Sequence, residues 1–412
     1  MKCKVLAVLL FSITLLSSNA WGASGALDPT FGNAGVVQGN SDFIFADAAL
    51  APNGDILVTG SDNDPGVGRF ATVARYLPNG TPDASFGTDG VVTLPPPSSF
   101  FLGTSFTMAL AVQPNGKILL VFFAFNNTST ETETLLLRLN VNGTTDTTFG
   151  AGGQVNLDFP VPTGWGASVT LVLAQPDGKI LLSGNVTPPF RNHSAPLTLL
   201  ARYLATGAPD TSFGNGGFVE EVSPVDLPNS IALRSDDSFT AVNTADEIAQ
   251  FSSTGAVVSA PSSAAIVLTK DTGVVALQSN GEYLEAGTVA GPIGRLNFDA
   301  EVVRFEATGV LDSSYESSVI RFGADGPSVK NVPAGIAVDA AGRGVLAVEF
   351  ESTTTASGIA RLNTNGSLDT TFGNAGIGST VPGFVVFAVL VQSNNQPIMV
   401  GGNGSLARFL AQ

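Results

Sequence analysis

The chain has 412 residues, of which 44% are hydrophobic and 13% are charged, and its formal net charge at pH 7 is −16. Disordered chains are poor in apolar residues and rich in charge, so this composition excludes a disordered protein. The acidic balance argues against nucleic acid or an anionic membrane surface as a partner, because both are bound by basic surfaces.

The first residues have the pattern of a secretory signal peptide. Lys2 and Lys4 make the start positive, and residues 5–16 form an apolar stretch. The small residues Ser18 and Ala20 supply a cleavage motif. The apolar stretch is shorter than the roughly 20 residues that a membrane-spanning helix needs, and an uncleaved N-terminal anchor is the alternative.

The sequence therefore predicts a signal peptide over residues 1–22 and one domain over residues 23–412, in a protein that is secreted or periplasmic. Cleavage would remove Cys3, the only cysteine, so no disulfide would hold the mature domain. We expect this domain to be a monomer that does not insert into a membrane once the signal peptide is removed.

From residue 27 onward, three short signatures recur in the same order. The first reads Leu-Asp-Pro-Thr-Phe-Gly-Asn-Ala-Gly-Val-Val at residues 27–37. The second reads Leu-Ala-Val-Gln-Pro-Asn-Gly-Lys-Ile-Leu-Leu at residues 110–120, and the third reads Ala-Arg-Tyr at residues 74–76. Repeats of this length are typical of solenoids and propellers.

Copies of these signatures divide the chain into units. The first signature recurs at residues 82–92, 145–155, 209–219 and 368–377, with a worn copy at 311–315. The turn of the second signature centres on Gly54, Gly116, Gly178, Asp237, Gly281, Gly342 and Asn395. Successive turns lie between 44 and 62 residues apart, which predicts seven units.

Each unit predicts four short strands, named A to D. Strand A precedes the Asn-Gly or Asp-Gly turn and strand B follows it, because such a dipeptide between apolar runs is a strong hairpin signal. Strand C carries the Ala-Arg-Tyr signature, and strand D carries Phe-Gly-x-x-Gly-Val-Val. Strands A and B are almost continuously apolar, as strands covered on both faces are. The predicted fold class is all-β, a seven-bladed β-propeller of four-stranded antiparallel blades.

The two ends of the repeat array favour a closed ring over an open solenoid. The array opens with a strand D at residues 27–37 and ends with strands A, B and C over residues 386–409. An open solenoid would leave bare strand edges and would need capping repeats. We expect the N-terminal strand to complete the C-terminal blade and so to close the ring.

An arginine in strand C and an aspartate in strand D recur together in six units. The predicted pairs are Arg75 with Asp83, Arg138 with Asp146, Arg202 with Asp210, Arg304 with Asp312, Arg361 with Asp369, and Arg408 with Asp28. In the fourth unit Gln250 replaces the arginine, and no Leu-Asp-x-x-Phe segment follows it. Because the two partners disappear together, we interpret each pair as a structural ion pair with fork-like hydrogen bonds rather than as a binding group.

No motif in the sequence reaches the specificity of a catalytic or cofactor site. His193 is the only histidine, and a lone loop imidazole supplies neither a metal cluster nor a proton relay. Neighbouring carboxylates such as Asp236 and Asp237 could bind Ca²⁺ or act on glycosidic bonds, yet an acidic chain produces such pairs by chance. We predict no catalytic residues, no cofactor and no metal, with Ca²⁺ as the alternative.

Recognition is expected on the face that carries the B–C and D–A loops, because these loops vary widely and recognition residues sit in variable loops on a rigid scaffold. The candidate recognition residues are Asp62, Phe100, Phe101, Trp165, Phe190, Arg191 and His193. Exposed aromatic side chains there would suit a protein, peptide or carbohydrate partner. The alternative is that these rings pack under their own loops.

Taken together, the ordered signatures Leu-Asp-x-x-Phe-Gly-x-x-Gly, Gln-Pro-Asn/Asp-Gly-Lys-Ile-Leu and Ala-Arg-Tyr resemble the delta-60 repeat family. The resemblance covers almost all of the chain after the signal peptide, and units four and seven depart most from it. It implies a β-propeller of secreted bacterial proteins. It transfers no catalytic residues, because no molecular function is established for that family.

The sequence favours a secreted, non-enzymatic binding or scaffold propeller over an enzyme. The alternative is an extracytoplasmic propeller enzyme, of the glycosidase or lyase kind, that uses carboxylates of the central channel. Carboxylates with raised pKa values there would favour the enzyme, whereas an apolar patch across several loops would favour the binding protein. A purely structural envelope component is a third hypothesis.

Overall fold

The computed structural model describes the chain from Gly22 to Gln412 with gaps. The described residues are 22–64, 68–94, 104–125, 132–163, 165–188, 197–221, 230–242, 248–259, 268–290, 298–322, 330–351 and 355–412. All regular secondary structure within these ranges is β-strand. Residues 1–21 of the predicted signal peptide lie outside them.

Five sheets have four strands each. The closing sheet, which joins both ends of the chain, contains β1 (Val36–Val37), β26 (Val386–Val391), β27 (Pro397–Gly401) and β28 (Leu406–Arg408). The next sheet contains β2 (Ile44–Leu50), β3 (Ile56–Asp64), β4 (Gly68–Tyr76) and β5 (Val91–Leu94). The third sheet contains β6 (Thr104–Val112), β7 (Ile118–Phe125), β8 (Thr132–Leu139) and β9 (Gln154–Asn156). The fourth sheet contains β10 (Gly166–Ala174), β11 (Ile180–Thr187), β12 (Leu197–Tyr203) and β13 (Phe218–Glu221). The fifth contains β14 (Ser230–Leu233), β15 (Phe239–Val242), β16 (Ile248–Phe251) and β17 (Val257–Ser259).

The remaining described strands form one sheet of eight. Its first part contains β18 (Leu268–Leu277), β19 (Tyr283–Ala290), β20 (Phe298–Phe305) and β21 (Val319–Ile320). Its second part contains β22 (Lys330–Val338), β23 (Gly344–Glu351), β24 (Thr355–Leu362) and β25 (Ile377–Pro382). A parallel bridge between Phe298 of β20 and Lys330 of β22 joins the two parts.

The prediction of seven separate four-stranded blades is therefore wrong. Only five four-stranded sheets stand alone among the described strands, because the other strands merge into the eight-stranded sheet. The strand D expected in the fifth unit is reduced to the two residues of β21, which pair with Ala300 and Glu301 of β20. Among the described strands, β21 does not reach Phe298 at the start of β20, and Lys330 of β22 pairs with Phe298 instead.

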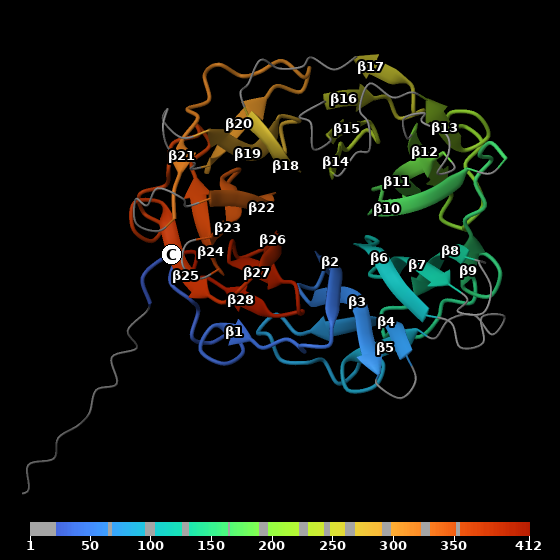
Figure 1. Cartoon of the computed structure of the whole chain (residues 1–412), viewed down its shortest axis with the longest axis horizontal. Coiled ribbons are helices and arrows are strands. Elements are labelled where there is room, and N and C mark those ends of the chain that lie inside the picture. Colours follow the sequence, from blue (N-terminus) through green and yellow to red (C-terminus); the bar gives the residue numbers. More distant parts are fainter. Residues whose placement is uncertain are drawn as a thin grey trace, which may run out of the picture.

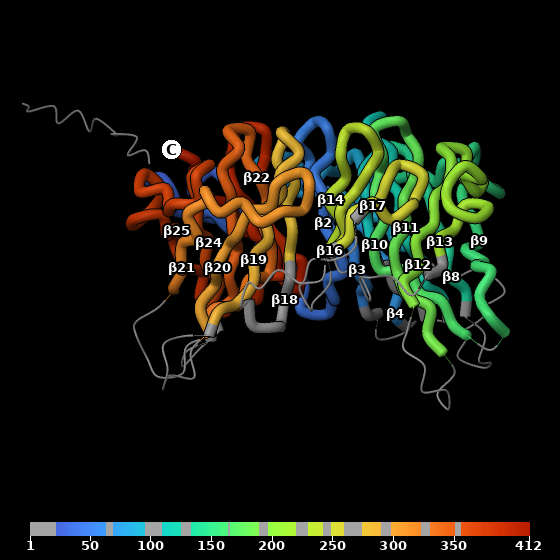
Figure 2. Tube along the Cα trace, turned by 90° about the horizontal axis from the view of Figure 1, so that it is seen from above, coloured from blue at the N-terminus to red at the C-terminus, as the bar shows by residue number. Residues whose placement is uncertain are grey.

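The sheets surround a common axis as an all-β propeller of antiparallel blades (Figure 1). The strands nearest the axis are β2, β6, β10, β14, β18, β22 and β26. Turned by 90°, the molecule is a disc in which the strands run between the same two faces (Figure 2). In a four-stranded meander the A–B turns and C–D corners share one of these faces, and the B–C and D–A connections share the other.

The first strand of the chain pairs with the last. β1 runs antiparallel to β28, with Val36 opposite Ala407 and Val37 opposite Leu406. A further bridge joins Leu27 to Phe409. The closing sheet thus takes its outermost strand from the N-terminal part of the chain and its other three strands from the C-terminal part, which closes the ring.

The A–B turns explain why glycine recurs in the second signature. In the first of them, Gly54 N donates to the carbonyl of Ala51 at 2.8 Å and Ala51 N donates to the carbonyl of Asp55 at 2.8 Å. Gly54 has a φ of 89°, so a left-handed residue ends the turn. Asp237 and Asn395 take this place in the worn units, with φ values of 64° and 65°, which aspartate and asparagine tolerate better than other side chains.

Apolar side chains pack between neighbouring sheets. One core cluster contains Ile398 and Val400 of β27 and Phe31, which precedes β1. These side chains pack with Ile56 and Val58 of β3 in the neighbouring sheet. Strands A and B of a blade are therefore covered on both faces, which agrees with their continuous apolar sequence. This packing gives the loops of each face a rigid base.

Candidate functional site

The structure brings together all six Arg–Asp pairs of strands C and D. The Nε atoms of Arg75, Arg138, Arg202, Arg304, Arg361 and Arg408 donate to Oδ2 of Asp83, Asp146, Asp210, Asp312, Asp369 and Asp28, at 2.6 to 3.0 Å. Each guanidinium also lies 4.4 to 4.8 Å from the centroid of an aromatic ring, in the order Phe86, Phe149, Phe213, Tyr315, Phe372 and Phe31. Such stacking adds a cation–π attraction to the ion pair.

Each of these arginines also reaches the next unit. Nη1 of Arg361 donates to the backbone carbonyl of Ala411 at 2.7 Å, and Nη1 of Arg408 donates to that of Pro78 at 2.5 Å. The same bond joins Arg75 to Val141, Arg138 to Ala205, Arg202 to Ser253 and Arg304 to Thr364. The arginines thus hold each unit to its neighbour, which is the geometry of a structural network.

Gln250 keeps part of this network in the fourth unit. Its Nε2 atom donates to the backbone carbonyl of Ala307 at 2.8 Å, as the arginines do to the unit that follows them. The substitution therefore loses the ion pair and retains the link between units. This explains how the fourth unit can lack both the arginine and its aspartate.

The aspartates of the network are held ionised. Burial opposes ionisation of Asp28, but hydrogen bonds from Thr30 and the charge of Arg408 hold its pKa below the usual value. Thr30 donates from its backbone N at 2.9 Å and from its Oγ1 at 2.7 Å, both to Oδ1 of Asp28. A carboxylate with occupied lone pairs and a lowered pKa does not serve as a general acid near neutral pH.

Two of the seven candidate recognition residues fall within the described residues. Asp62 lies on β3 and accepts a hydrogen bond from Nδ2 of Asn40 at 3.2 Å. Trp165 precedes β10, is partly buried and packs against the core between the β6–β9 and β10–β13 sheets. The position of Trp165 agrees with the alternative given above, in which such rings pack inward and are not displayed for a partner. Phe100, Phe101, Phe190, Arg191 and His193 lie outside the described residues.

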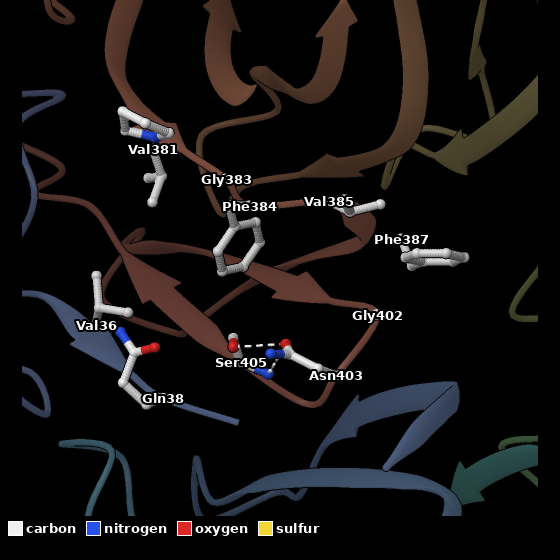
Figure 3. A pocket seen from close by; sticks show the side chains of 11 residues that line it. Val36, Gln38, Val381, Gly383, Phe384, Val385, Phe387, Gly402, Asn403 and Ser405 are labelled. Atoms are coloured by element: carbon white, nitrogen blue, oxygen red, sulfur yellow. Dashed lines mark hydrogen bonds between the residues drawn. The ribbon is translucent and has the colours of Figure 1, made fainter. Parts of the chain in front are cut away.

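A pocket of about 520 Å³ opens in the closing sheet, on the face of the B–C and D–A connections (Figure 3). Its walls come from the β25–β26 connection, from the β27–β28 turn and from the end of β1. Val36 and Val381 line it at the outermost strands, and Phe387 lines it at the innermost strand. The pocket is therefore a groove that runs from the rim of the disc toward the axis.

Phe387 is exposed because β26 contains a β-bulge. The pairing of β26 with β27 skips Phe387, which has no partner on β27. A bulge bends its strand and re-aims the extra side chain, and Phe387 is 53% exposed. Ala46 and Ala334 occupy the corresponding bulges of β2 and β22. The closing sheet thus places an aromatic ring where these two sheets have a methyl group.

Hydrogen bonds fix the walls of the groove. Ser357 donates from its Oγ to the carbonyl of Phe384 at 2.6 Å. Gly402 N donates to the carbonyl of Val385 at 3.0 Å, which ties the β27–β28 turn to the β25–β26 connection. The groove is therefore formed before any ligand arrives, as ligand sites usually are.

The polar groups of the groove are amides and a hydroxyl. Oδ1 of Asn403 accepts a hydrogen bond from Oγ of Ser405 at 2.6 Å (Figure 3). Within the described residues, Nδ2 of Asn403 and the side chain of Gln38 have no hydrogen-bond partner. The groove thus combines apolar walls with a few amide groups, and its lining includes no titratable residue.

Exposed apolar side chains continue from the groove along the inner strands. Val385 is 39% exposed, and Ile44 at the start of β2 is 49% exposed. The rings of Phe45 and Phe387 lie 5.7 Å apart between centroids and link the two sheets. Contiguous exposed apolar surface marks interaction sites. Sequence reasoning missed this patch because it searched the long loops, although an aromatic residue in a strand A rich in small residues was a usable signal.

A second pocket of about 510 Å³ lies on the opposite face, between the third and fourth units. It is lined by Ser212, Gly214 and Phe218 of the third unit and by Thr254 and Val257 of the fourth. It is a packing gap between two units rather than a site with convergent polar groups.

Asp47 is the one carboxylate with a raised pKa among the described side chains of the innermost strands. Burial raises the pKa of Asp47 to about 6, although Leu110 N and Ala48 N donate to its oxygens at 2.9 and 2.8 Å. The bond from Leu110 links β2 to β6. A single carboxylate does not form the pair that glycoside hydrolysis uses, so this observation does not favour the enzyme.

Replacing Asp47 by asparagine is expected to be more favourable for the stability of the fold at pH 8 than at pH 4.5. The folded-state pKa of Asp47 is raised above its unfolded value, so its contribution to stability is greatest at low pH and is lost as pH rises through about 6. After a discount for partial exposure, Asp47→Asn should gain about 1–2 kcal/mol at pH 8 relative to pH 4.5. Thermal melts at both pH values measure this difference, with the exposed Asp42→Asn as control. An equal effect at the two pH values would contradict the prediction.

Within the described ranges, no group of three or more His, Cys, Asp or Glu side chains is arranged to hold a metal ion. The prediction about Ca²⁺ stays a prediction. The same ranges contain no helix of the length and hydropathy needed to cross a membrane.

Four segments of the chain match a family described as "Domain of unknown function (DUF5122) beta-propeller". The matched residues are 51–86, 113–149, 175–213 and 342–372. These segments carry the A–B turn, the arginine and the aspartate of their units. The match supports a propeller repeat, as the sequence signatures predicted. No curated protein matches the chain.

Two solved structures match the chain over most of its length. The WD40 beta propeller domain of Doa1 matches with a TM-score of 0.43 and 13% identity, over 92% of this chain and 96% of that one. BamB from Moraxella catarrhalis matches with a TM-score of 0.40 and 10% identity, over 91% of this chain and 96% of that one.

Proposed function

We propose that this protein is a non-enzymatic binding propeller that recognises a protein or peptide partner through the groove of the closing sheet. The observation that carries the proposal is the bulge that exposes Phe387 beside a preformed, uncharged groove. Binding energy in protein interfaces concentrates on a few aromatic anchors in desolvated pockets. The groove lies on the face where recognition was expected, although on different residues.

The lining favours a peptide over a carbohydrate. Val36, Val381 and Val385 give the groove aliphatic walls that would bury an apolar side chain. The amide of Gln38 and Nδ2 of Asn403, which have no partner among the described residues, can bond the backbone of an extended segment. A sugar would need more polar groups than these two amides provide.

We further propose that the protein acts outside the cytoplasm, after removal of the signal peptide, and that its repeats belong to the delta-60 family. The apolar start of the chain and the ordered signatures support these two assignments. A mass measurement of the exported protein tests the first, because cleavage within residues 18–22 fixes its new N-terminus.

The binding proposal is tested with a phage-displayed library of random heptapeptides on the immobilised protein. Selected peptides are expected to bind at least tenfold more weakly to Phe387→Ser, because the exposed anchor is lost. Val258→Ser is the matched control, since Val258 is 66% exposed on β17, away from the groove. Melting curves check that both variants fold.

Two results would overturn the binding proposal. One is a selection that enriches no sequence, and the other is a set of peptides that bind Phe387→Ser as tightly as the wild type. A glycan array run in parallel covers the carbohydrate alternative. Glycan binding that Phe387→Ser abolishes would assign the groove to sugars instead.

A further inference from the structure

The groove is uncharged, but the loop at its border carries an aspartate, Asp42. Residues 38–43 connect the end of β1 to β2, and Gln38 at the start of this loop lines the groove. Gly39 N donates to Oγ of Ser405 in the opposite wall at 3.0 Å, which fixes the loop against the groove. Asp42 follows Gly39 by three residues in this loop.

Two carboxylates belong to this border. Nδ2 of Asn40 donates to Oδ1 of Asp62 at 3.2 Å, and Asp42 N donates to Oδ1 of Asn40 at 3.0 Å. Asn40 thus connects the loop at Asp42 to Asp62 of β3. The side chain of Asp42 is exposed and that of Asp62 is partly exposed.

Neither carboxylate is neutralised within the described part of the molecule. The ion pairs of the described residues include neither Asp42 nor Asp62. Arg69, which lies opposite Asn63 in the β3–β4 register, makes no ion pair with Asp62. The aspartates of the Arg–Asp network, by contrast, are each matched by a cation. Among the described residues, the border thus carries two carboxylates without an ion-pair partner.

We propose that the groove binds an extended peptide segment in which one large apolar side chain is accompanied by lysine or arginine. This inference rests on the proposed function and adds the chemical class of the partner. The apolar side chain would pack between Phe387 and the valine walls. The cationic side chain would extend to Asp42 and Asp62 at the border. Charge complementarity of this kind selects partners and steers their approach.

The inference is tested with three acetylated, amidated and fluorescently labelled peptides. Their sequences are Lys-Ser-Leu-Phe-Ser-Lys, Gln-Ser-Leu-Phe-Ser-Gln and Glu-Ser-Leu-Phe-Ser-Glu, which share the apolar centre and differ in charge. By fluorescence anisotropy, the basic peptide should bind about fivefold or more tightly than the neutral one, and the acidic peptide more weakly than either. This order should shrink in 0.5 M NaCl, because salt screens exposed charges.

The double variant Asp42→Asn/Asp62→Asn assigns the effect to the border. It should bring the basic peptide to within about twofold of the neutral one and leave the affinity of the neutral peptide unchanged. Asn40 can still donate to an amide oxygen at position 62, so the turn should persist, and a melting curve verifies the fold. Asp89→Asn, at an exposed C–D corner on the opposite face, is the matched charge control.

The outcomes separate this inference from the proposed function. If the neutral or acidic peptide binds the wild type as tightly as the basic one, or if the double variant keeps the preference, the charge inference is wrong and the groove proposal stands. If none of the three peptides binds, the charge inference is wrong and the heptapeptide selection decides on the groove. If Phe387→Ser binds all of them like the wild type, both are wrong.

Discussion

Replacing Arg408 by alanine is expected to lower the free energy of unfolding by about 3–5 kcal/mol, the cost of breaking one side of a buried ion pair. Arg408 is 6% exposed and its partner Asp28 is 2% exposed. The variant would leave Asp28 with Thr30 and Gln396 as donors but with no cation. It would also lose the bond from Arg408 to Pro78 in the next unit. Chemical denaturation and thermal melting measure the loss.

A matched substitution distinguishes this effect from the loss of any ion pair. Arg321 pairs with Asp299 at 2.7 Å, but its side chain is 51% exposed. Arg321→Ala should cost less than Arg408→Ala, because solvent screens the exposed guanidinium, although the variant leaves the buried Asp299 without this partner. Arg408→Lys keeps the charge without the fork of donors and should fall between the two. An Arg408→Ala variant that melts with the wild type would refute a stabilising role for the closure pair.

Phe372→Ala is expected to destabilise the fold by a similar amount, about 3–5 kcal/mol, because it empties a closely packed position. The ring of Phe372 is fully buried and belongs to the core between β22–β25 and the closing sheet. The guanidinium of Arg361 lies 4.5 Å from its centroid and would lose this partner. Differential scanning calorimetry of the purified variant gives the size of the effect.

Phe387→Ala supplies the control, because it removes the same ring from an exposed position and should cost less than about 1 kcal/mol. Phe372→Tyr tests the shape of the site, since Tyr315 occupies the corresponding place in the fifth unit. Within the described residues the hydroxyl of Tyr315 has no hydrogen-bond partner, so a tyrosine fits there at some cost. Equal losses of stability for Phe372→Ala and Phe387→Ala would contradict the prediction, because they would show that burial of the Phe372 ring does not add to the stability of the fold.

The features that the sequence predicted well are those repeated many times in it. The pairing of β1 with β28 follows from an unaccompanied strand D at one end of the array and a missing one at the other. The partners of each arginine follow from its disappearance in the fourth unit together with the aspartate. Repetition turns a weak local pattern into a strong one, because each copy tests the same assignment.

The features that the sequence did not predict are those found in one unit alone. The joining of two parts into the eight-stranded sheet depends on a single bridge between Phe298 and Lys330, which the local pattern does not show. The groove depends on the bulge at Phe387, and a bulge is a matter of register rather than of composition. Sequence periodicity also could not show that Trp165 packs inward.

Because β1 pairs with β28 and closes the ring, the array has no terminal repeat from which unfolding could start. Linear repeat proteins lose their end units first, since each end unit has one neighbour instead of two. In a ring every unit has two neighbours, so local opening must break contacts on both sides. Hydrogen exchange in the closing sheet should therefore be as slow as in the interior sheets, even though its strands come from the two extremes of the chain.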